Sequence, residues 1–277
     1  MTAALHAPTG GLRIVRLFPD LLGTYGDDGN AIVLERRAAW RGFPATIIDV
    51  TARDSVPDDG HVYVIGGGED GPQVRATKTL ADSGAVHRAV ERGAAVLAVC
   101  AGFQVLGTSF AGPDGSTTVG LGLLDVSTAR GTGPRIVGEV VVEADPGLGI
   151  GVLTGYENHA GVSTLGPQAR ALGVARVGTG NHPAGAHAEG AWQDRIVATY
   201  LHGPVLARNP ALADRLLAWA LDVEPADLQP LDDRPIDALR RERFSRAASE
   251  RAAAANPSTR ASAARIARRF RRRPSGA

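Results

Sequence analysis

Cysteine is almost missing from this sequence of 277 residues, which contains only Cys100. A single cysteine excludes an intrachain disulfide and leaves a free thiol, which suits a reducing compartment. Cysteines and histidines at the spacing of metal ligands are also missing, so we predict no metal site. The function of Cys100 therefore has to be sought in its chemistry as a thiol.

Long apolar runs are absent as well. None approaches the ~18 residues that a membrane-spanning helix needs, so we predict no transmembrane segment. Met1 to Gly10 lacks the basic region and apolar core of a signal peptide, which favours a cytoplasmic protein. With 44% hydrophobic residues, the chain can still bury a substantial core, as one large domain or two smaller ones.

Charge is unevenly distributed, although the net charge is only +1. Residues 232–277 contain thirteen arginines against five acidic residues, so the preceding residues are net acidic. We expect a short tail over 1–11, a domain over 12–231, and a basic, Arg/Ala-rich C-terminal extension over 232–277 that is partly disordered. Its possible helices are Ile236–Ala254 and Ala263–Phe270.

The basic extension has a functional alternative. It could be an arm that contacts an acidic partner, anionic lipid or nucleic acid. Its aromatic residues, Phe244 and Phe270, are too sparse to argue for base stacking. No nucleic-acid partner is therefore predicted.

Short apolar strands alternate with helical segments through the first half and again near residue 200. This alternation predicts an α/β fold with a mostly parallel sheet flanked by helices, whose functional loops lie at the carboxyl ends of the strands. The expected strands are Leu12–Leu17, Ala45–Val50, His61–Ile65, Val96–Val99 and Ile196–Tyr200, and the expected helices are Ala31–Trp40, Val74–Arg92, Phe103–Phe110 and Pro210–Leu221.

The pattern changes beyond Gly112. Short strand-like stretches are broken by glycine and proline, with little helix between them, which predicts a β-rich second half. These stretches are Val119–Val126, Ile136–Glu143, Gly149–Gly155 and Leu172–Gly178.

Cys100 follows a buried strand and precedes a helix, with Ala101 and Gly102 directly after it. A reactive side chain on a tight strand-to-helix turn with small neighbours is a nucleophile elbow. The helix N-terminus would favour a thiolate and help to hold an oxyanion. The competing interpretation is a buried cysteine that acts only as a small apolar residue.

A thiol nucleophile needs a base, and His202 is the best-placed histidine because it follows a second buried strand. His159 is the next candidate, whereas His61 should lie at the opposite edge of the sheet. An oxyanion also needs two backbone N–H donors. We expect these from Ala101 and from the glycine loop, at Gly67 or Gly68.

The glycine loop Gly66–Gly71 lacks the Lys-Ser or Lys-Thr of a phosphate-binding loop. No nucleotide site is therefore predicted in this chain.

Three motifs together resemble class I glutamine amidotransferases of the cobyric-acid-synthase-like branch. They are Gly66-Gly67-Gly68-Glu69-Asp70, Cys100-Ala101-Gly102-Phe103-Gln104 and Tyr200-Leu201-His202-Gly203-Pro204. Within that branch, two further stretches resemble the glutaminase subunits of lipid II isoglutaminyl synthases. These are Phe18–Leu22 with Tyr25–Asn30, and Leu153–Gly161. The resemblance extends over about Leu12 to Leu221 and leaves out the basic extension.

The resemblance implies that Cys100 attacks the side-chain amide of glutamine, with His202 as base and then acid. Arg135 would hold the glutamine α-carboxylate, and Gln104 would be a second substrate-binding residue. Ammonia would pass to a Mur-ligase-like partner, MurT, in a heterodimer. The partner would bind ATP and Mg²⁺ and amidate D-glutamate in lipid II at the inner membrane surface, while this chain would need no cofactor.

Many members of the class place a glutamate two residues after the catalytic histidine, where this chain has Pro204. The third member of a triad is then missing, comes from another acidic residue such as Glu157, or comes from the partner. A carboxylate from the partner would make hydrolysis slow in the isolated chain and faster in the complex.

Two other functions are compatible with the motifs. One is an amidotransferase subunit for another carboxylated acceptor, such as a corrinoid. The other is a catalytically silent module that keeps the fold only to bind a partner.

Overall fold

A six-stranded sheet forms the centre of the molecule in the computed structural model, which describes residues 8, 10–24, 26–182 and 187–255. Five strands are parallel and only β13 is antiparallel, so the predicted α/β fold with a mostly parallel sheet is confirmed. The order across the sheet is β13 (Ala191–Gln193), β14 (Ile196–Thr199), β4 (Ala95–Val99), β3 (Val62–Ile65), β1 (Leu12–Leu17) and β2 (Ala45–Val50).

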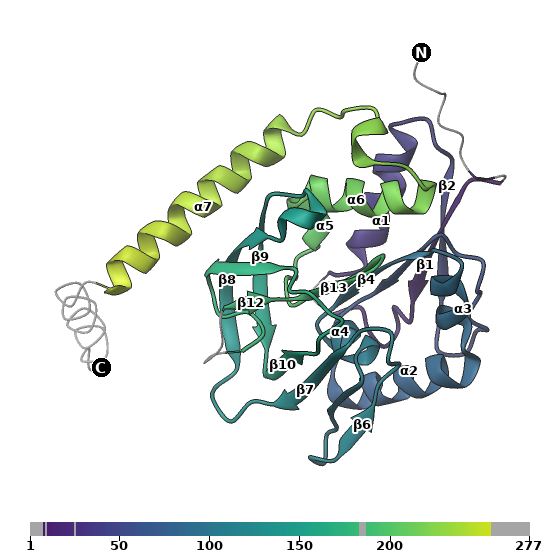
Figure 1. The fold of residues 1–277 in the computed structure, drawn as a ribbon, viewed down its shortest axis with the longest axis horizontal. Helices are drawn as coiled ribbons and strands as arrows, with labels where there is room; N and C mark the ends of the chain where they lie inside the picture. Colours follow the sequence, from purple (N-terminus) through teal and green to yellow (C-terminus); the bar gives the residue numbers. More distant parts are fainter. Residues whose placement is uncertain (1–7, 9, 25, 183–186, 256–277) are drawn as a thin grey trace, which may run out of the picture.

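Two groups of helices flank this sheet (Figure 1). The first group contacts β1 to β4 and consists of α1 (Gly29–Ala39), α5 (Val205–Arg208) and α6 (Pro210–Leu221). The second group consists of α2 (Asp70–Ser83), α3 (Ala85–Glu91) and α4 (Ala101–Leu106).

Two helix predictions are corrected by the structure. The single helix expected over Val74–Arg92 is two helices, because Gly84 adopts the left-handed conformation (φ 61°) that ends α2. The helix expected over Phe103–Phe110 begins earlier and ends at Leu106, and Ser109–Ala111 is a strand. The first error lies at a glycine, and the second arises because Ser109–Ala111 pairs with Thr117–Val119 and with the strand Val126–Arg130 instead of extending the helix.

The second half is β-rich, as predicted, and contains two four-stranded sheets. The expected strand Val119–Val126 is wrong, since one strand ends at Val119 and the next begins at Val126. Gly149 and Gly151 have positive φ and form a turn, so the strand expected from Gly149 starts at Val152. One sheet is β10 (Gly161–Leu165), β7 (Val126–Arg130), β5 (Ser109–Ala111) and β6 (Thr117–Val119); the other is β12 (Ala188–Glu189), β11 (Gly173–Val177), β8 (Ile136–Ala144) and β9 (Val152–His159).

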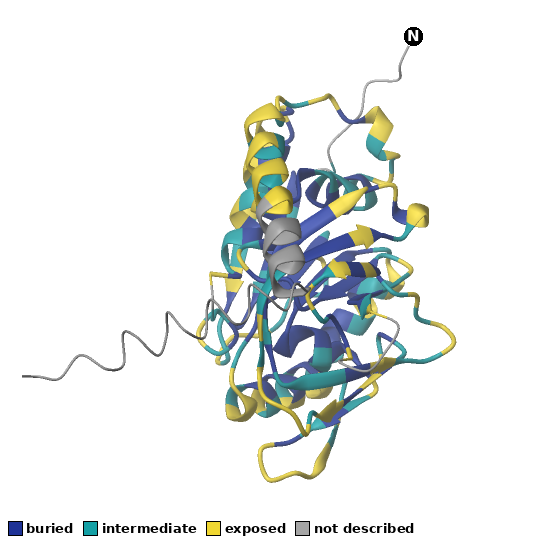
Figure 2. Cartoon of the chain, turned by 90° about the vertical axis from the view of Figure 1, so that its left-hand side faces the viewer, coloured by how far each residue is buried: buried dark blue, intermediate teal, exposed yellow. Residues whose placement is uncertain are grey.

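The core lies around the central strands, which Figure 2 shows as a dark blue interior. Every residue of β3, β4 and β14 is buried, as expected for parallel strands covered on both faces. The short 3₁₀ helices Pro146–Leu148 and Pro225–Asp227 complete the described elements.

Helix α7 (Arg234–Ala255) covers the range expected to be helical in the basic extension. It packs against β8, β9 and β11. Arg240 of α7 forms an ion pair with Asp237, and Arg243 approaches Glu139 of β8. The second expected helix, Ala263–Phe270, lies outside the described residues. Within the part of the chain that is described, none of the helices has the length and apolarity to cross a bilayer.

Candidate active site

Four loops meet at the carboxyl edge of the parallel sheet. They follow β1, β3, β4 and β14, and they carry Asp27, the glycine loop, Cys100 and His202 respectively. Strand register fixes their relative positions because β3, β4 and β14 are neighbours in the sheet. The topology therefore produces the predicted meeting, at one edge of the sheet, of Cys100, the glycine loop and His202.

Cys100 has the backbone of a nucleophile elbow. It adopts φ 53° and ψ −103°, a conformation that costs a non-glycine residue free energy and persists only where the surroundings enforce it. Its N–H donates to the Thr199 carbonyl of β14 and its carbonyl accepts from the Gln104 N–H of α4. The thiol is thus held between β4 and the N-terminus of α4.

Gly102 explains why the elbow needs a small residue. A Cβ at this position would lie 2.7 Å from the carbonyl oxygen of Ile65, at the end of β3. Since backbone cannot withdraw easily, any side chain here would push α4 away from the sheet.

His202 is buried and has a carboxylate partner in Asp27. The Nδ1 atom of His202 lies 3.0 Å from Oδ2 and 3.3 Å from Oδ1 of Asp27, which is itself fully buried. The backbone N–H of His202 donates to the carbonyl of Tyr156 in β9 at 2.9 Å. These contacts fix both the ring and the main chain of His202.

Burial would disfavour the charged imidazolium, but the contacts of His202 outweigh this effect. Its hydrogen bond to Asp27, together with the negative charge of Asp27 and the proximity of Cys100, raises the pKa of His202 to about 9. The site therefore favours a protonated His202 next to Cys100 at neutral pH. An imidazolium in this position stabilises a neighbouring thiolate.

Gly67 is packed between the groups just described. A Cβ on Gly67 would lie 2.9 Å from Cε1 of His202, 3.1 Å from Oδ2 of Asp27 and 3.4 Å from Cβ of Cys100. Its N–H donates to Oδ2 of Asp27 at 2.9 Å. Gly67 thus orients the carboxylate and keeps the space beside His202 clear.

This bond distinguishes the two glycines that the sequence left as alternatives for the oxyanion hole. The N–H of Gly67 is already committed to Asp27, whereas Gly68 lines the pocket together with Cys100 and Ala101. Ala101 is the first residue of α4, where a backbone N–H has no acceptor within the helix. The geometry favours Gly68 and Ala101 as the pair of donors.

Pro204 lies two residues after His202, where many class I glutamine amidotransferases have a glutamate. Its ring packs against Gly29 at the start of α1, where an added Cβ would lie 2.4 Å from Cγ of Pro204. This close packing holds the loop after β14 against the loop that carries Asp27. The carboxylate beside His202 therefore comes from the loop after β1.

The geometry does not support Glu157 as the partner of His202. Both carboxylate oxygens of Glu157 accept backbone N–H groups, from Thr179 at 2.8 Å and Gly180 at 2.9 Å. The Nε2 atom of His159 lies 3.9 Å from Oε2 of Glu157. The carboxylate of Glu157 is thus engaged by the backbone at Thr179 and Gly180.

His159, the second candidate base, is also engaged elsewhere. Its Nδ1 atom is 2.9 Å from the carbonyl oxygen of Gly161, and its ring stacks on Tyr200 with centroids 3.7 Å apart. His61 lies before β3, at the other end of the sheet from Cys100, as predicted. His202 is the histidine that reaches Cys100.

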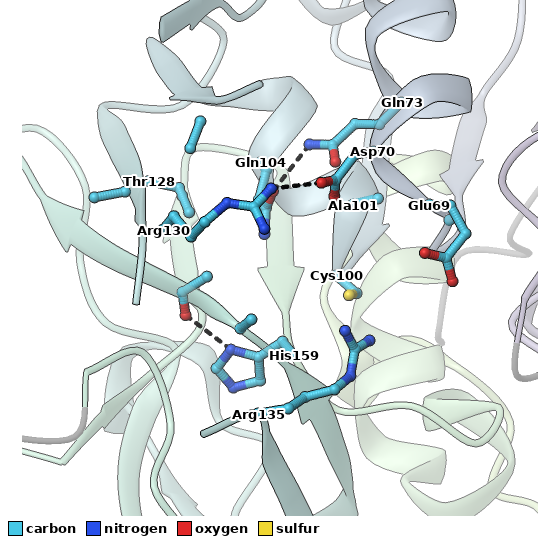
Figure 3. Close-up of a pocket in the computed structure, with 15 residues that line it drawn as sticks. Glu69, Asp70, Gln73, Cys100, Ala101, Gln104, Thr128, Arg130, Arg135 and His159 are labelled. Atoms are coloured by element: carbon cyan, nitrogen blue, oxygen red, sulfur yellow. Dashed lines mark hydrogen bonds and ion pairs between the residues drawn. The ribbon is translucent and has the colours of Figure 1, made fainter. Parts of the chain in front are cut away.

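A pocket of about 240 Å³ opens above Cys100, between α2, α4 and the β-rich half (Figure 3). Both predicted substrate-binding residues line it. Arg135 donates to the side-chain and backbone oxygens of Asn158, and Gln104 bridges Gln73 (2.9 Å) and the Tyr200 hydroxyl (3.3 Å). The pocket therefore combines a thiol, amides and guanidinium groups.

Asp27 is the residue of this site that sequence reasoning missed. The stretch around it contributed to the resemblance, but no role followed from it. The signal that could have identified Asp27 is its place after β1, because loops at the carboxyl ends of parallel strands converge. Within the described ranges, there is no group of three or more His, Cys, Asp or Glu residues arranged to hold a metal ion.

Residues 13–210 match the CobB/CobQ-like glutamine amidotransferase domain, so the chain belongs to this family. It is similar to subunit GatD of lipid II isoglutaminyl synthase (glutamine-hydrolyzing) from Staphylococcus aureus, with 34% identity over 76% of this chain and 85% of the relative. The same subunit from Streptococcus pneumoniae is 32% identical over 76% of this chain and 80% of the relative. The predicted family resemblance is confirmed.

The fold gives an independent comparison. A crystal structure of a glutamine amidotransferase superposes with a TM-score of 0.51, covering 75% of this chain and 98% of that chain at 22% identity. At this identity the match supports the shared fold.

Proposed function

We propose that this chain is the glutaminase subunit of a lipid II isoglutaminyl synthase. It hydrolyses glutamine through a thioester on Cys100 and supplies ammonia to a Mur-ligase-like subunit of the MurT type. The observation that carries the proposal is the contact of His202 with both Cys100 and Asp27, at a strained elbow in a chain similar to GatD.

The reaction begins with attack of the Cys100 sulfur on the carbonyl carbon of the glutamine side-chain amide. The tetrahedral oxyanion is stabilised by the N–H groups of Gly68 and Ala101. His202 then gives its proton to the leaving nitrogen, which departs as ammonia. A water molecule, deprotonated by His202, attacks the thioester, and glutamate leaves as the thiol is restored.

Asp27 is a positioning residue in this mechanism. By accepting a hydrogen bond from Nδ1–H of His202, it keeps the other ring nitrogen available to the thiol and stabilises the imidazolium. The contact removes the reason to expect a carboxylate from the partner. We therefore expect the isolated chain to hydrolyse glutamine.

Ammonia would be consumed by the partner. That subunit would bind ATP and Mg²⁺, activate the α-carboxyl of D-glutamate in lipid II, and form the amide. This places the pair in peptidoglycan synthesis, in the cytoplasm and at the inner membrane surface through its lipid-linked acceptor. No described residue group of this chain supplies a metal site for that step.

Labelling of the thiol tests the glutaminase part of the proposal. 6-Diazo-5-oxo-L-norleucine, a glutamine-like electrophile, should modify Cys100 of the full chain, and glutamine should block the modification. Mass spectrometry of the intact protein and its peptides reports the result. A chain that stays unmodified, or is modified equally with and without glutamine, would contradict the proposal.

The acceptor is tested with the complex. The chain is purified with its Mur-ligase-like partner and incubated with lipid II, glutamine, ATP and Mg²⁺. Amidation replaces the –OH of the α-carboxyl by –NH2, so mass spectrometry should show a slightly lighter stem peptide. Cys100→Ala should abolish amidation from glutamine but leave amidation from ammonium chloride intact, since the partner binds ammonia directly.

A further inference from the structure

The pocket above Cys100 contains more charge than the reacting amide of glutamine requires. Glu69, Asp70, Arg130 and Arg135 all line it. The amide is neutral, but the other end of free glutamine carries an ammonium and a carboxylate. The family resemblance implies a binding residue only for the carboxylate, Arg135, so an anionic group for the ammonium remains to be identified.

Asp70 and Arg130 form an ion pair in the wall of this pocket. The Nη2 atom of Arg130, at the end of β7, lies 2.6 Å from Oδ2 of Asp70, the first residue of α2. Figure 3 shows the pair beside Gln73 and Gln104, with Cys100 and Arg135 farther along the pocket. The pair thus joins the parallel half to the β-rich half across one side of the cavity.

This ion pair is not explained by stability. Both side chains are about half exposed, 52% for Arg130 and 50% for Asp70. Ion pairs with this exposure contribute little to the free energy of unfolding, because water screens them and ordering the side chains costs entropy. A carboxylate fixed in the wall of a pocket is, however, well suited to binding a cation.

Asp70 keeps an acceptor available for such a cation. Arg130 engages Oδ2, and no hydrogen bond or ion pair within the described ranges engages Oδ1. Arg130 restrains the carboxylate, so little conformational freedom is lost when a ligand binds. Glu69, the other acidic lining residue, points in a different direction from Asp70 in Figure 3 and forms no ion pair with Arg130.

We propose that Asp70, restrained by Arg130, binds the α-ammonium of glutamine and so selects the free amino acid over amides that lack this group. The inference rests on the proposed function, since it assigns a specificity residue to the same pocket. Asp70 and Arg135 would then hold the two charges of the amino-acid head, while the amide reaches Cys100.

The test compares two amides in ammonia release by the full chain: L-glutamine, and glutaramate, which is glutamine without its α-amino group. The wild type should prefer L-glutamine. Asp70→Asn should lower kcat/KM for L-glutamine roughly tenfold to a hundredfold, mainly through KM, as expected for the loss of a charged hydrogen bond. It should leave kcat/KM for glutaramate unchanged.

Two further variants separate recognition from structure. Glu69→Gln is the matched control, because it removes a neighbouring acidic side chain that also lines the pocket, and it should preserve the preference for L-glutamine. Arg130→Gln should weaken the preference in the same direction but by less, because Asp70 loses its restraint and keeps its charge.

Three results would overturn the inference. Asp70→Asn could leave KM for L-glutamine unchanged, it could lower activity on both amides equally, or Glu69→Gln could be the variant that removes the preference. A wild-type chain that neither releases ammonia nor is labelled at Cys100 would instead overturn the proposed function, and this inference with it.

Discussion

The two halves of the molecule contribute different things to the site. The parallel half supplies Cys100, His202 and Asp27 from strand ends, and all three are buried. The β-rich half supplies Arg130 and Arg135, which lie in the pocket wall and bond to groups near the surface. Buried groups at strand ends are fixed by the sheet, whereas exposed side chains are fixed only by their own contacts. We therefore expect the chemical step, measured by kcat, to depend on the parallel half, and substrate affinity to depend on the β-rich half.

A buried carboxyl group joins the halves. Glu189 of β12 accepts hydrogen bonds from the Thr199 hydroxyl and the Tyr200 N–H, both at 2.8 Å, at the end of β14. This is the strand end that carries His202. The two halves are thus coupled through a group that is out of contact with water.

The largest effect is expected from a substitution in the parallel half, at Asp27. Asp27→Asn should lower kcat for glutamine hydrolysis about a hundredfold to ten-thousandfold, because His202 loses the acceptor that fixes its tautomer. The same change removes one cause of the raised pKa of His202, so the pH–rate profile should shift to lower pH. Steady-state ammonia release over a range of pH measures both.

Asp28→Asn is the control for Asp27, since Asp28 is the adjacent acidic residue and Asp27 supplies the carboxylate that contacts Nδ1 of His202. It should leave kcat close to that of the wild type. Equal losses in the two variants would show that the loop, and not the carboxylate, matters.

An intermediate effect is expected at the junction of the halves. Burial raises the pKa of Glu189 to about 7, with the charge of Glu157 adding to the shift and the hydrogen bonds of Thr199 and Tyr200 opposing it. Because the folded-state pKa is above the ordinary value of 4.5, stability from this group is full below pH 4.5 and is lost as pH rises through 7. The loss between pH 5 and 7 should be about 2 kcal/mol.

Glu189→Gln tests this expectation, because glutamine keeps an acceptor and cannot ionise. Urea unfolding at a series of pH values should show that the free energy of unfolding of Glu189→Gln changes less between pH 5 and 7 than that of the wild type. His202 contributes to the free energy of unfolding at higher pH. The stabilisation from its raised pKa is fully present below pH 6.5 and is lost as pH rises through 9. A wild-type slope that persists in Glu189→Gln would contradict the assignment to Glu189.

The smallest effect is expected from the pocket wall. Arg135→Ala should raise KM for L-glutamine about tenfold and change kcat little, because it removes a charge-assisted hydrogen bond to a group that does not react. Arg176→Ala, on the exposed side of β11, is a matched control that should leave KM unchanged. A fall in kcat with constant KM would place Arg135 in the chemical step and weaken the contrast between the halves.

Sequence periodicity predicted the parallel half better than the β-rich half. Strands β3, β4 and β14 of the parallel half are buried along their whole length, and Pro210–Leu221 is helical over the predicted range. In the β-rich half, strands begin and end at turns that glycine permits but does not require. Val119 and Val126 belong to different strands, although the residues between them would suit one strand.

Local sequence determined the elbow, the glycine loop and the histidine. The apolar run into Cys100, the small residues after it, and the strand that ends before His202 are each confined to a few consecutive residues. Such patterns act through local backbone geometry, so they can be recognised without knowing what packs against them. The family resemblance rested on the same short stretches.

Tertiary structure decided which carboxylate meets His202 and which glycine N–H remains available for an oxyanion. Asp27 is 175 residues from His202 in the chain, and only the order of strands in the sheet brings the two side chains together. Glu157 and Asp27 are both acidic residues within two positions of a motif glycine, and nothing in the local sequence distinguishes their roles. The same strand order turns the Gly67 N–H toward Asp27 and leaves Gly68 facing the pocket, because hydrogen bonds between distant loops are set by packing and not by spacing in the sequence.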